Sequence, residues 1–249
     1  MAGHSKWANI KRQKARVDAK KGKTFTQLSR AIIVAARSGI PDPAGNFQLR
    51  TAIEKAKAAG IPNENIARSL AKGAGTYQED GVVFEEIRYE GYGIDGVAIL
   101  IEALTDNRNR AAADIRAAFS KNGGNLGETG CVSWMFEQKG VVTLEGELVE
   151  DILLEVSVEA GAENYEIIEA EDIQIAEVFT EIGNLEAVHQ SLKASGLPVK
   201  EAELRWIANN TIEINDLEKT RSLMKLIETL ESLDDVQNVT ANCALSLEN

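Results

Sequence analysis

The stretch 141–180 reads VVTLEGELVEDILLEVSVEAGAENYEIIEAEDIQIAEVFT, and it predicts a strand, a helix and two further strands. Its strand-like runs are Val141–Leu144, Tyr165–Ile168 and Ile173–Thr180. Leu148–Glu159 places Ile152 and Val156 on one face of a helix. A strand at Val132–Phe136, before a Gln-Lys-Gly turn, precedes this stretch; a helix at Leu185–Ala194 and a strand at Val199–Ile207 follow it. From Val141 onward the order is strand-helix-strand-strand-helix-strand, which is the ferredoxin-like unit.

The flanking sequence predicts a second unit of the same kind, divided into two halves. Its elements are strands at Val82–Tyr89 and Val97–Leu104, a helix at Asn107–Lys121, a short strand at Thr211–Ile214, a helix at Asp216–Ser232 and a strand at Val236–Leu245. Two units in tandem would leave the last helix and strand without partners. We therefore expect residues 130–205 to form an acidic α/β domain inserted into an α/β domain made of 81–129 and 206–249.

Residues 1–80 predict a small helical bundle instead. Its expected helices are Ser5–Lys21, a second that begins at Thr24 and ends before Gly39 and Pro41, Asn46–Ala59, and a fourth from Pro62 to Gly73. Thr24 and Gln27 form a capping box for the second helix, and Gly22 separates it from the first. The fold class is therefore α+β: an N-terminal small helical bundle followed by two ferredoxin-like α/β domains, one inserted in the other.

The charge of the chain is unevenly distributed. Residues 1–80 carry 15 Lys and Arg against 6 Asp and Glu, whereas residues 81–249 carry 12 against 33. The middle stretch 130–205 is strongly acidic, with 17 Asp and Glu against 4 Lys and Arg. Salt screens charges over about 10 Å, so the acidic part does not cancel the field of a distant basic lobe. This asymmetry indicates that the N-terminal domain contacts nucleic acid.

The first expected helix holds most of the positive charge. Like charges at i and i+4 repel, and a bound polyanion offsets that repulsion; the alternative is a solvated basic face. Trp7 is a candidate for stacking on a base, with a place in the core as the alternative. The predicted nucleic-acid-binding residues are Lys6, Trp7, Lys11, Arg12, Lys14, Arg16, Lys20, Lys21, Lys23, Arg30, Arg37 and Arg50.

A secondary anion site is a weaker hypothesis, at Arg108 and Arg110. Asp106 or Asn107 caps the helix that follows, which puts both arginines in its first turn, where the helix dipole disfavours cations. Either a bound anion or an acidic partner within the protein would relieve this conflict. The sequence favours the intramolecular partner.

Other classes of site are disfavoured. Gly91–Gly96 matches G-x-G-x-x-G, but a strand follows it where a dinucleotide site needs a helix, so a hairpin turn is predicted. The carboxylates near Glu150 lack metal-ligand spacing, and Cys131 and Cys243 form no C-x-x-C. No apolar run approaches the length of a membrane span. We therefore expect a cytoplasmic, non-enzymatic protein without metal, cofactor or small-molecule substrate.

Long motifs along the whole chain resemble the YebC family. They are Gly3–Ile10, Gly22–Phe25, Val34–Arg37, Asp42-Pro43, Leu49-Arg50, Ala52–Lys57, Asn65-Ile66, Lys72–Gly75, Glu90–Gly93, Leu104–Arg110, Asn122–Gly127 and Leu233–Val239. Gln13 and Gln27 stand where the family pattern has basic residues, which puts individual phosphate contacts in doubt.

The resemblance implies a three-domain protein and two competing functions. The family carries the label of probable transcriptional regulators that bind DNA, and this label favours a DNA-binding regulator of transcription. Its mitochondrial relatives are translational activators of cytochrome c oxidase, and bacterial members are linked to ribosomes that stall on proline runs. A ribosome-associated factor that contacts ribosomal RNA explains the charge asymmetry better, and no helix-turn-helix is evident in the sequence.

Overall fold

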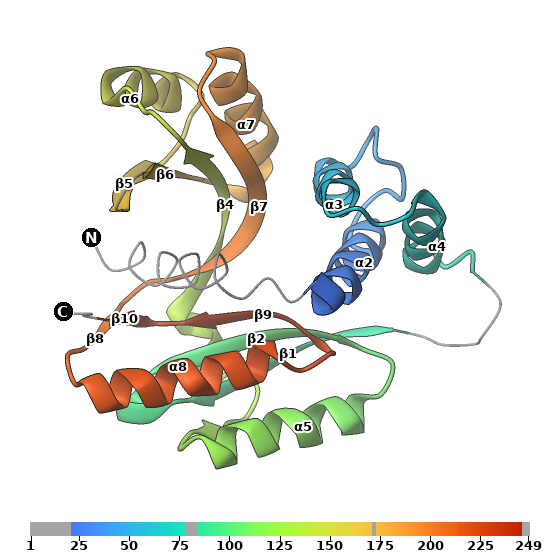
Figure 1. Ribbon diagram of the computed structural model, residues 1–249, viewed down its shortest axis with the longest axis vertical. Helices are drawn as coiled ribbons and strands as arrows, with labels where there is room; N and C mark the ends of the chain where they lie inside the picture. Colours follow the sequence, from blue (N-terminus) through green and yellow to red (C-terminus); the bar gives the residue numbers. More distant parts are fainter. Residues whose placement is uncertain (1–20, 78–83, 171–172, 246–249) are drawn as a thin grey trace. The chain divides into compact units, whose positions relative to one another are not determined.

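The computed structural model describes residues 21–77, 84–170 and 173–245 (Figure 1). The described residues form two compact units, one of Phe136–Asn209 and the other of the segments on either side of it. The N-terminal helices precede two antiparallel sheets, which confirms the α+β class. The domain limits 1–80, 81–129 with 206–249, and 130–205 stay predictions.

The unit Phe136–Asn209 has the predicted ferredoxin-like order. Its elements are β4 (Phe136–Glu145), α6 (Glu150–Glu159), β5 (Asn164–Ala170), β6 (Ile173–Thr180), α7 (Leu185–Ala194) and β7 (Val199–Ala208). The strands pair antiparallel in the order β5-β6-β4-β7. Both helices cover the same face of the sheet (Figure 1), where Leu153 of α6 and Val188 of α7 are buried.

The predicted turn at Gln138–Gly140 is wrong, because β4 continues through it as one strand. Gly140 lies inside this strand, and a Cβ there would stand 2.9 Å from the Leu185 Cβ of α7. The glycine therefore allows the helix to approach the sheet, and it does not mark a turn. The predicted strand Val132–Phe136 is accordingly replaced by a short 3₁₀ turn, η2 (Ser133–Met135), before β4.

The second sheet is built from both halves of the outer sequence. Its strands are β1 (Glu85–Tyr92), β2 (Ala98–Thr105), β3 (Asn125–Leu126) and β9 (Val236–Ala241), in the order β3-β1-β2-β9. The hairpin between β1 and β2 contains η1 (Ile94–Gly96), so the glycine-rich motif is a turn, as predicted. The helices of this sheet are α5 (Arg108–Lys121) and α8 (Leu217–Glu231).

The outer sheet differs from the expected strand order in one respect. In a ferredoxin-like sheet the strand near Thr211–Ile214 would lie beside the strand Ala98–Thr105, but β1 occupies that place. The short β8 (Ile212–Ile214) pairs instead with β10 (Cys243–Leu245) in a parallel ladder. Asn242 separates β10 from β9, and its side chain accepts a hydrogen bond from the Ala98 N–H at 2.7 Å. This bond explains why the expected last strand is broken.

The N-terminal helices are α2 (Lys21–Arg37), α3 (Phe47–Ala58) and α4 (Asn63–Gly73). They pack around Ile32, Leu49 and Ala56, all fully buried. The predicted break at Gly22 and the capping box at Thr24 are wrong, because α2 already includes Lys21 and Gly22. A glycine inside a helix costs only about 1 kcal/mol relative to alanine, which packing offsets. The expected first helix, apart from Lys21, lies outside the described residues.

Replacing Gly91 with alanine is expected to lower the free energy of unfolding by about 1–3 kcal/mol, because the new Cβ overpacks the core. That Cβ would stand 2.6 Å from the ring of Phe119 on α5 and 2.7 Å from the Asn125 carbonyl oxygen of β3. Urea denaturation measures the change. Gly183→Ala is the control, since nothing lies within 4 Å of a Cβ there. Equal effects of the two substitutions would contradict the packing argument.

Candidate nucleic-acid interface

The predicted nucleic-acid-binding residues fall into two groups. Lys6, Trp7, Lys11, Arg12, Lys14, Arg16 and Lys20 lie outside the described residues, and Lys21 and Lys23 belong to the first turns of α2. The side chains of Arg30, Arg37 and Arg50 are described, and each has a partner within its own unit. These three arginines therefore have a structural role in the described part of the chain.

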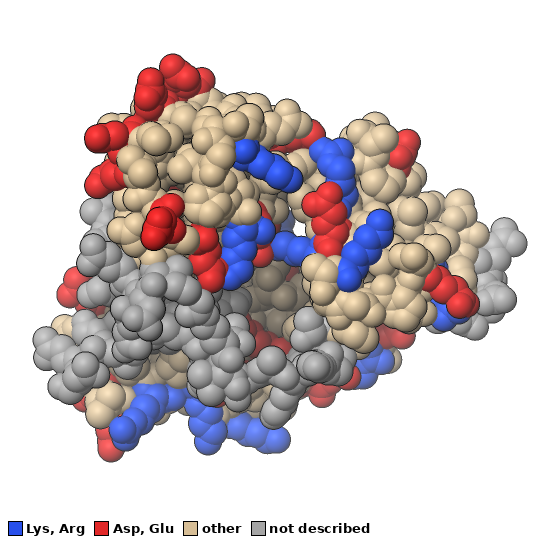
Figure 2. Space-filling view, turned by 45° about the horizontal axis from the view of Figure 1, so that its top comes forward, with Lys and Arg blue, Asp and Glu red and all other residues tan. Residues whose placement is uncertain are grey.

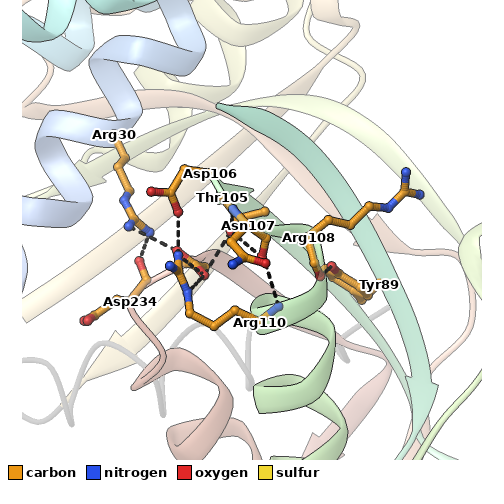
Figure 3. A network of polar contacts seen from close by, with 9 residues as sticks. Arg30, Tyr89, Thr105, Asp106, Asn107, Arg108, Arg110 and Asp234 are labelled. Atoms are coloured by element: carbon orange, nitrogen blue, oxygen red, sulfur yellow. Dashed lines mark hydrogen bonds and ion pairs between the residues drawn. The ribbon is translucent and has the colours of Figure 1, made fainter. Parts of the chain in front are cut away.

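Arg30 connects α2 to the loop that follows α8. Its guanidinium forms an ion pair with the Asp235 carboxylate at 3.1 Å and donates a hydrogen bond to the Asp234 carbonyl oxygen (Figure 3). The Arg30 side chain is only 14% exposed and that of Asp235 only 7%. Because this pair is shielded from water, the removal of one partner would leave the other charge without compensation, which costs far more than it does at an exposed pair.

Arg110 approaches the same carboxylate from α5. Its Nη2 lies 3.0 Å from Asp235 Oδ2 and 2.6 Å from Asp106 Oδ1. The hydrogen bond from Arg110 lowers the pKa of Asp106, and the hydrogen bonds to Asp106 and Asp235 raise the pKa of Arg110. The Thr105 hydroxyl lies 3.0 Å from Asp235 Oδ2. We call Arg30, Thr105, Asp106, Arg110 and Asp235 the Asp235 cluster.

The Asp235 cluster supplies the intramolecular partner that the sequence favoured for Arg110. Asn107 caps α5, because its side chain accepts a hydrogen bond from the Arg110 N–H at 3.0 Å. Arg108 remains exposed, and its side chain points away from the cluster (Figure 3). Of the two arginines of the proposed secondary anion site, Arg110 is therefore paired within the Asp235 cluster, and Arg108 lies outside it.

A cavity of about 660 Å³ adjoins the Asp235 cluster. Arg30, Asp106, Arg110 and Asp235 contribute to its wall, together with Asp114 and the apolar side chains of Ile115 and Val236. Because its two arginines are already paired with carboxylates of the same wall, the cavity has no concentrated positive charge for a phosphate.

Arg37 and Arg50 bind backbone carbonyl groups. Arg37 donates to the Phe84 carbonyl oxygen, next to the start of β1. Arg50 donates to the Pro43 carbonyl oxygen at 2.9 Å, and its guanidinium lies 5.4 Å from the centroid of the Phe47 ring. These contacts fix the loops around α2 and α3. Nucleic-acid binding by Arg37 and Arg50 stays a prediction.

The sequence argument passed over the cations on α5 and α8. Arg116, Lys121, Arg221 and Lys225 are all exposed. Arg221 and Lys225 stand at i and i+4 on α8, the same spacing as Arg12 and Arg16. The helical spacing of these cations can be found in the sequence. They were passed over because residues 81–249 carry a large excess of Asp and Glu.

The charge of the unit Phe136–Asn209 has the opposite sign. Asp and Glu side chains gather at its α6 end, near the top of Figure 2. On α6 the exposed carboxylates are Glu150, Asp151, Glu155 and Glu159. Such a surface repels phosphate, so this end of the unit is unsuited to nucleic acid.

Comparison with known proteins assigns the whole arrangement to a family. Residues 5–76 match the TACO1/YebC protein N-terminal domain, and residues 84–243 match the TACO1/YebC second and third domain. The chain belongs to the TACO1/YebC family. The N-terminal match contains the basic residues 6–23 and helices α2–α4, and the second match contains both four-stranded sheets, so the resemblance noted in the sequence is confirmed.

Close TACO1/YebC relatives cover nearly the full length of the chain. A probable transcriptional regulatory protein of Gloeothece citriformis is 76% identical over 97% of this chain and 95% of its own length. One of Rippkaea orientalis is 73% identical over 100% of this chain and 97% of its own. A crystal structure of a conserved hypothetical protein from Aquifex aeolicus has a TM-score of 0.82 at 46% identity, covering 94% of each chain.

Among the described residues, no group of His, Cys, Asp and Glu is arranged to hold a metal ion. The helices that the structure describes include none long and apolar enough to cross a membrane.

Proposed function

We propose that this member of the TACO1/YebC family is a cytoplasmic, non-enzymatic regulator of gene expression that binds nucleic acid through its basic N-terminal segment, Lys6–Lys23. The observation that carries the proposal is the separation of charge along the chain. The segment has eight Lys and Arg against a single acidic residue, Asp18. Each phosphate contact by such a segment releases counterions and adds to affinity. The relatives named as probable transcriptional regulatory proteins support DNA as the first candidate target.

Ribosomal RNA is the second candidate, favoured by a specific observation. The unit Phe136–Asn209 presents exposed carboxylates and would be repelled by a long duplex that extends beyond the N-terminal segment. On a ribosome, by contrast, the basic segment would contact RNA while the acidic unit faces a protein surface. Crosslinking in cells followed by sequencing of the bound nucleic acid separates the two targets. Recovery of ribosomal RNA alone would eliminate promoter DNA as the target.

Replacing Arg12 and Arg16 with glutamate is expected to weaken binding to both a short duplex DNA and a ribosomal RNA fragment, and to reduce its salt dependence. For two lost phosphate contacts, the slope of log K against log salt falls by about 1.8 on duplex DNA and about 1.4 on a single strand. Fluorescence anisotropy over a series of salt concentrations measures both effects.

The control variant is Arg221→Glu with Lys225→Glu, on α8. It makes the same change in net charge at the same i, i+4 spacing, on exposed residues of the described structure. We expect a smaller loss of affinity and an unchanged salt slope. Equal slopes for the two double variants would show that only net charge matters, and would contradict binding through the basic segment.

A further inference from the structure

Helix α6 carries a large share of the exposed apolar side chains in the described structure. Nine large apolar side chains are exposed among the described residues, and four of them lie between positions 149 and 158. Of the other described helices that pack on the sheets, α5 and α7 have none, and α8 has only Leu217, at its first position. Apolar residues exposed singly are normal, but a concentration on one element points to an interaction surface. The four are Val149, Ile152, Leu154 and Val158.

The inner side of α6 buries a polar residue, while apolar residues lie on its outer side. Leu153 is fully buried, and Ser157, one turn later, is buried with a hydroxyl that has no hydrogen-bond partner among the described residues. Leu154 and Val158, which directly follow these two, are 46% and 66% exposed. The stability of the unit alone would favour an apolar residue at position 157 and polar residues at 154 and 158. The outer side of α6 is therefore suited to a second contact.

Carboxylates border the exposed apolar pair. At about 100° per residue, Leu154 and Val158 form one stripe along the helix. Glu150 lies on one side of this stripe, and Asp151 and Glu155 lie on the other. All three carboxylates are exposed, and α6 contains no Lys or Arg to neutralise them. Figure 2 shows the Asp and Glu side chains gathered at this end of the unit. We call these five residues the α6 face.

The charge of the α6 face restricts what can cover it. Its carboxylates repel the phosphates of nucleic acid and the headgroups of anionic lipids. Two copies of this chain cannot pair through it either, because a two-fold contact would bring like charges together. A protein surface with apolar side chains beside Lys or Arg fits both the stripe and its borders, since interfaces combine an apolar centre with a rim of complementary charge.

We propose that the α6 face is a docking site for another protein, which packs apolar side chains against Leu154 and Val158 and places Lys or Arg beside Asp151 and Glu155. This inference rests on the proposed function for the source of the partner, because proteins that bind nucleic acid present clustered Lys and Arg. The basic N-terminal segment then holds the nucleic acid, while the α6 face holds a basic protein of the same assembly.

Photo-crosslinking in cells identifies the partner and tests its chemistry. A benzophenone amino acid replaces the exposed Val158 in the full chain, and the same replacement at Leu217, 50% exposed on α8, is the control. We expect position 158, and not position 217, to capture a protein through a peptide in which Lys and Arg outnumber Asp and Glu. Capture of nucleic acid, of a second copy of this chain, of a peptide without that excess, or of nothing beyond the control would overturn the proposal.

Binding kinetics with a synthetic copy of the captured peptide separate the two parts of the α6 face. Leu154→Ser with Val158→Ser removes the apolar stripe without changing net charge, and should weaken binding by at least about 10-fold, mainly through faster dissociation. Asp151→Lys with Glu155→Lys reverses the charge of one border, and should slow association by about 10-fold at low salt. Full affinity in either double variant would contradict the assigned role of that part.

Asp114→Lys with Glu218→Lys is the matched control for charge. It makes the same change in net charge on exposed carboxylates of α5 and α8. We expect association with the peptide to slow less than in the α6 variant. Equal slowing by the two variants would show that only net charge matters, and would contradict docking on α6.

Nucleic-acid binding distinguishes failure of this proposal from failure of the proposed function. Leu154→Ser with Val158→Ser should keep the affinity of the full chain for the same duplex DNA and ribosomal RNA fragment, because the α6 face repels phosphate. A loss of that affinity would contradict the separation of the two sites. Absence of nucleic-acid binding in the unaltered chain would refute the proposed function, whereas the crosslinks from position 158 would still confirm or refute the docking site.

Discussion

Replacing Asp235 with alanine is expected to lower the free energy of unfolding by about 3 kcal/mol, since it leaves the guanidinium of Arg30 buried without its carboxylate. Asp235 is 6% exposed and receives two arginines from different helices. The contribution from Arg110 is small, because that side chain is 46% exposed and its charge is screened by water. Most of the loss therefore comes from Arg30. Urea denaturation followed by circular dichroism measures the change.

The neighbouring Asp234 provides a matched control. Its backbone carbonyl accepts a hydrogen bond from Arg30, but its side chain is exposed. Asp234→Ala keeps that carbonyl and should change the free energy of unfolding by less than about 0.5 kcal/mol. A double-mutant cycle with Arg30→Met isolates the pair, and its coupling energy should exceed that of a cycle with Arg110→Met. Equal destabilisation by the two aspartate variants would refute the assigned role of the cluster.

The Asp235 cluster also shows where sequence reasoning stops. The sequence assigns Arg30 to nucleic acid because it continues a positive run, and within the described residues its guanidinium pairs with a carboxylate 205 positions away. Local charge patterns carry no information about such a contact. For Arg110 the sequence does predict a nearby anion, because a cation in the first turn of a helix conflicts with the helix dipole. The sequence predicted that a partner was needed, but not that the partner was Asp235.

The same distinction holds for the fold. The helix Leu185–Ala194 was predicted with its observed limits, and Asp216 caps α8 through the N–H groups of Glu218 and Lys219. Periodicity and caps are local signals, so they can be found in one sequence. The sequence predicts breaks at Gly22 and Gly140, but Gly22 lies inside α2 and Gly140 lies inside β4. A glycine required by close packing, such as Gly140, looks the same in a sequence as one at a turn. The positions of Leu185 and Thr180, each 2.9 Å from a Cβ on Gly140, explain this glycine.

The second large effect is expected at Glu90, a buried carboxylate on β1. Its two oxygens accept hydrogen bonds from the backbone N–H groups of Gly130, Val132 and Ser133 at 2.7–2.8 Å. These bonds hold the loop before β4 against the sheet. Glu90→Gln turns an amide NH₂ toward donors, and should lower the free energy of unfolding by about 2–3 kcal/mol. Alkylation of the half-buried Cys131 in the same loop should become faster, while the buried Cys243 stays protected.

The pH dependence distinguishes this role from simple packing. Burial alone would raise the pKa of Glu90, but the hydrogen bonds from the three N–H groups outweigh it, and the pKa is lowered. A carboxylate with a lowered pKa stabilises the fold above its unfolded pKa of about 4.5, and this stabilisation is lost as the pH falls through the folded pKa. Wild-type stability should therefore fall more steeply with acidification than that of Glu90→Gln.

Glu86, on the same strand, is the control with the opposite sign. Burial raises its pKa, Arg37 opposes that shift, and Glu102 adds to it. Folding therefore disfavours the charged form of Glu86, so Glu86→Gln should leave stability at neutral pH unchanged or slightly higher. If Glu90→Gln and Glu86→Gln gave the same acid profile, the three N–H groups would not be what holds the loop. If the two substitutions change the pH dependence of stability in opposite directions, hydrogen bonding, and not burial alone, distinguishes Glu86 from Glu90 on this strand.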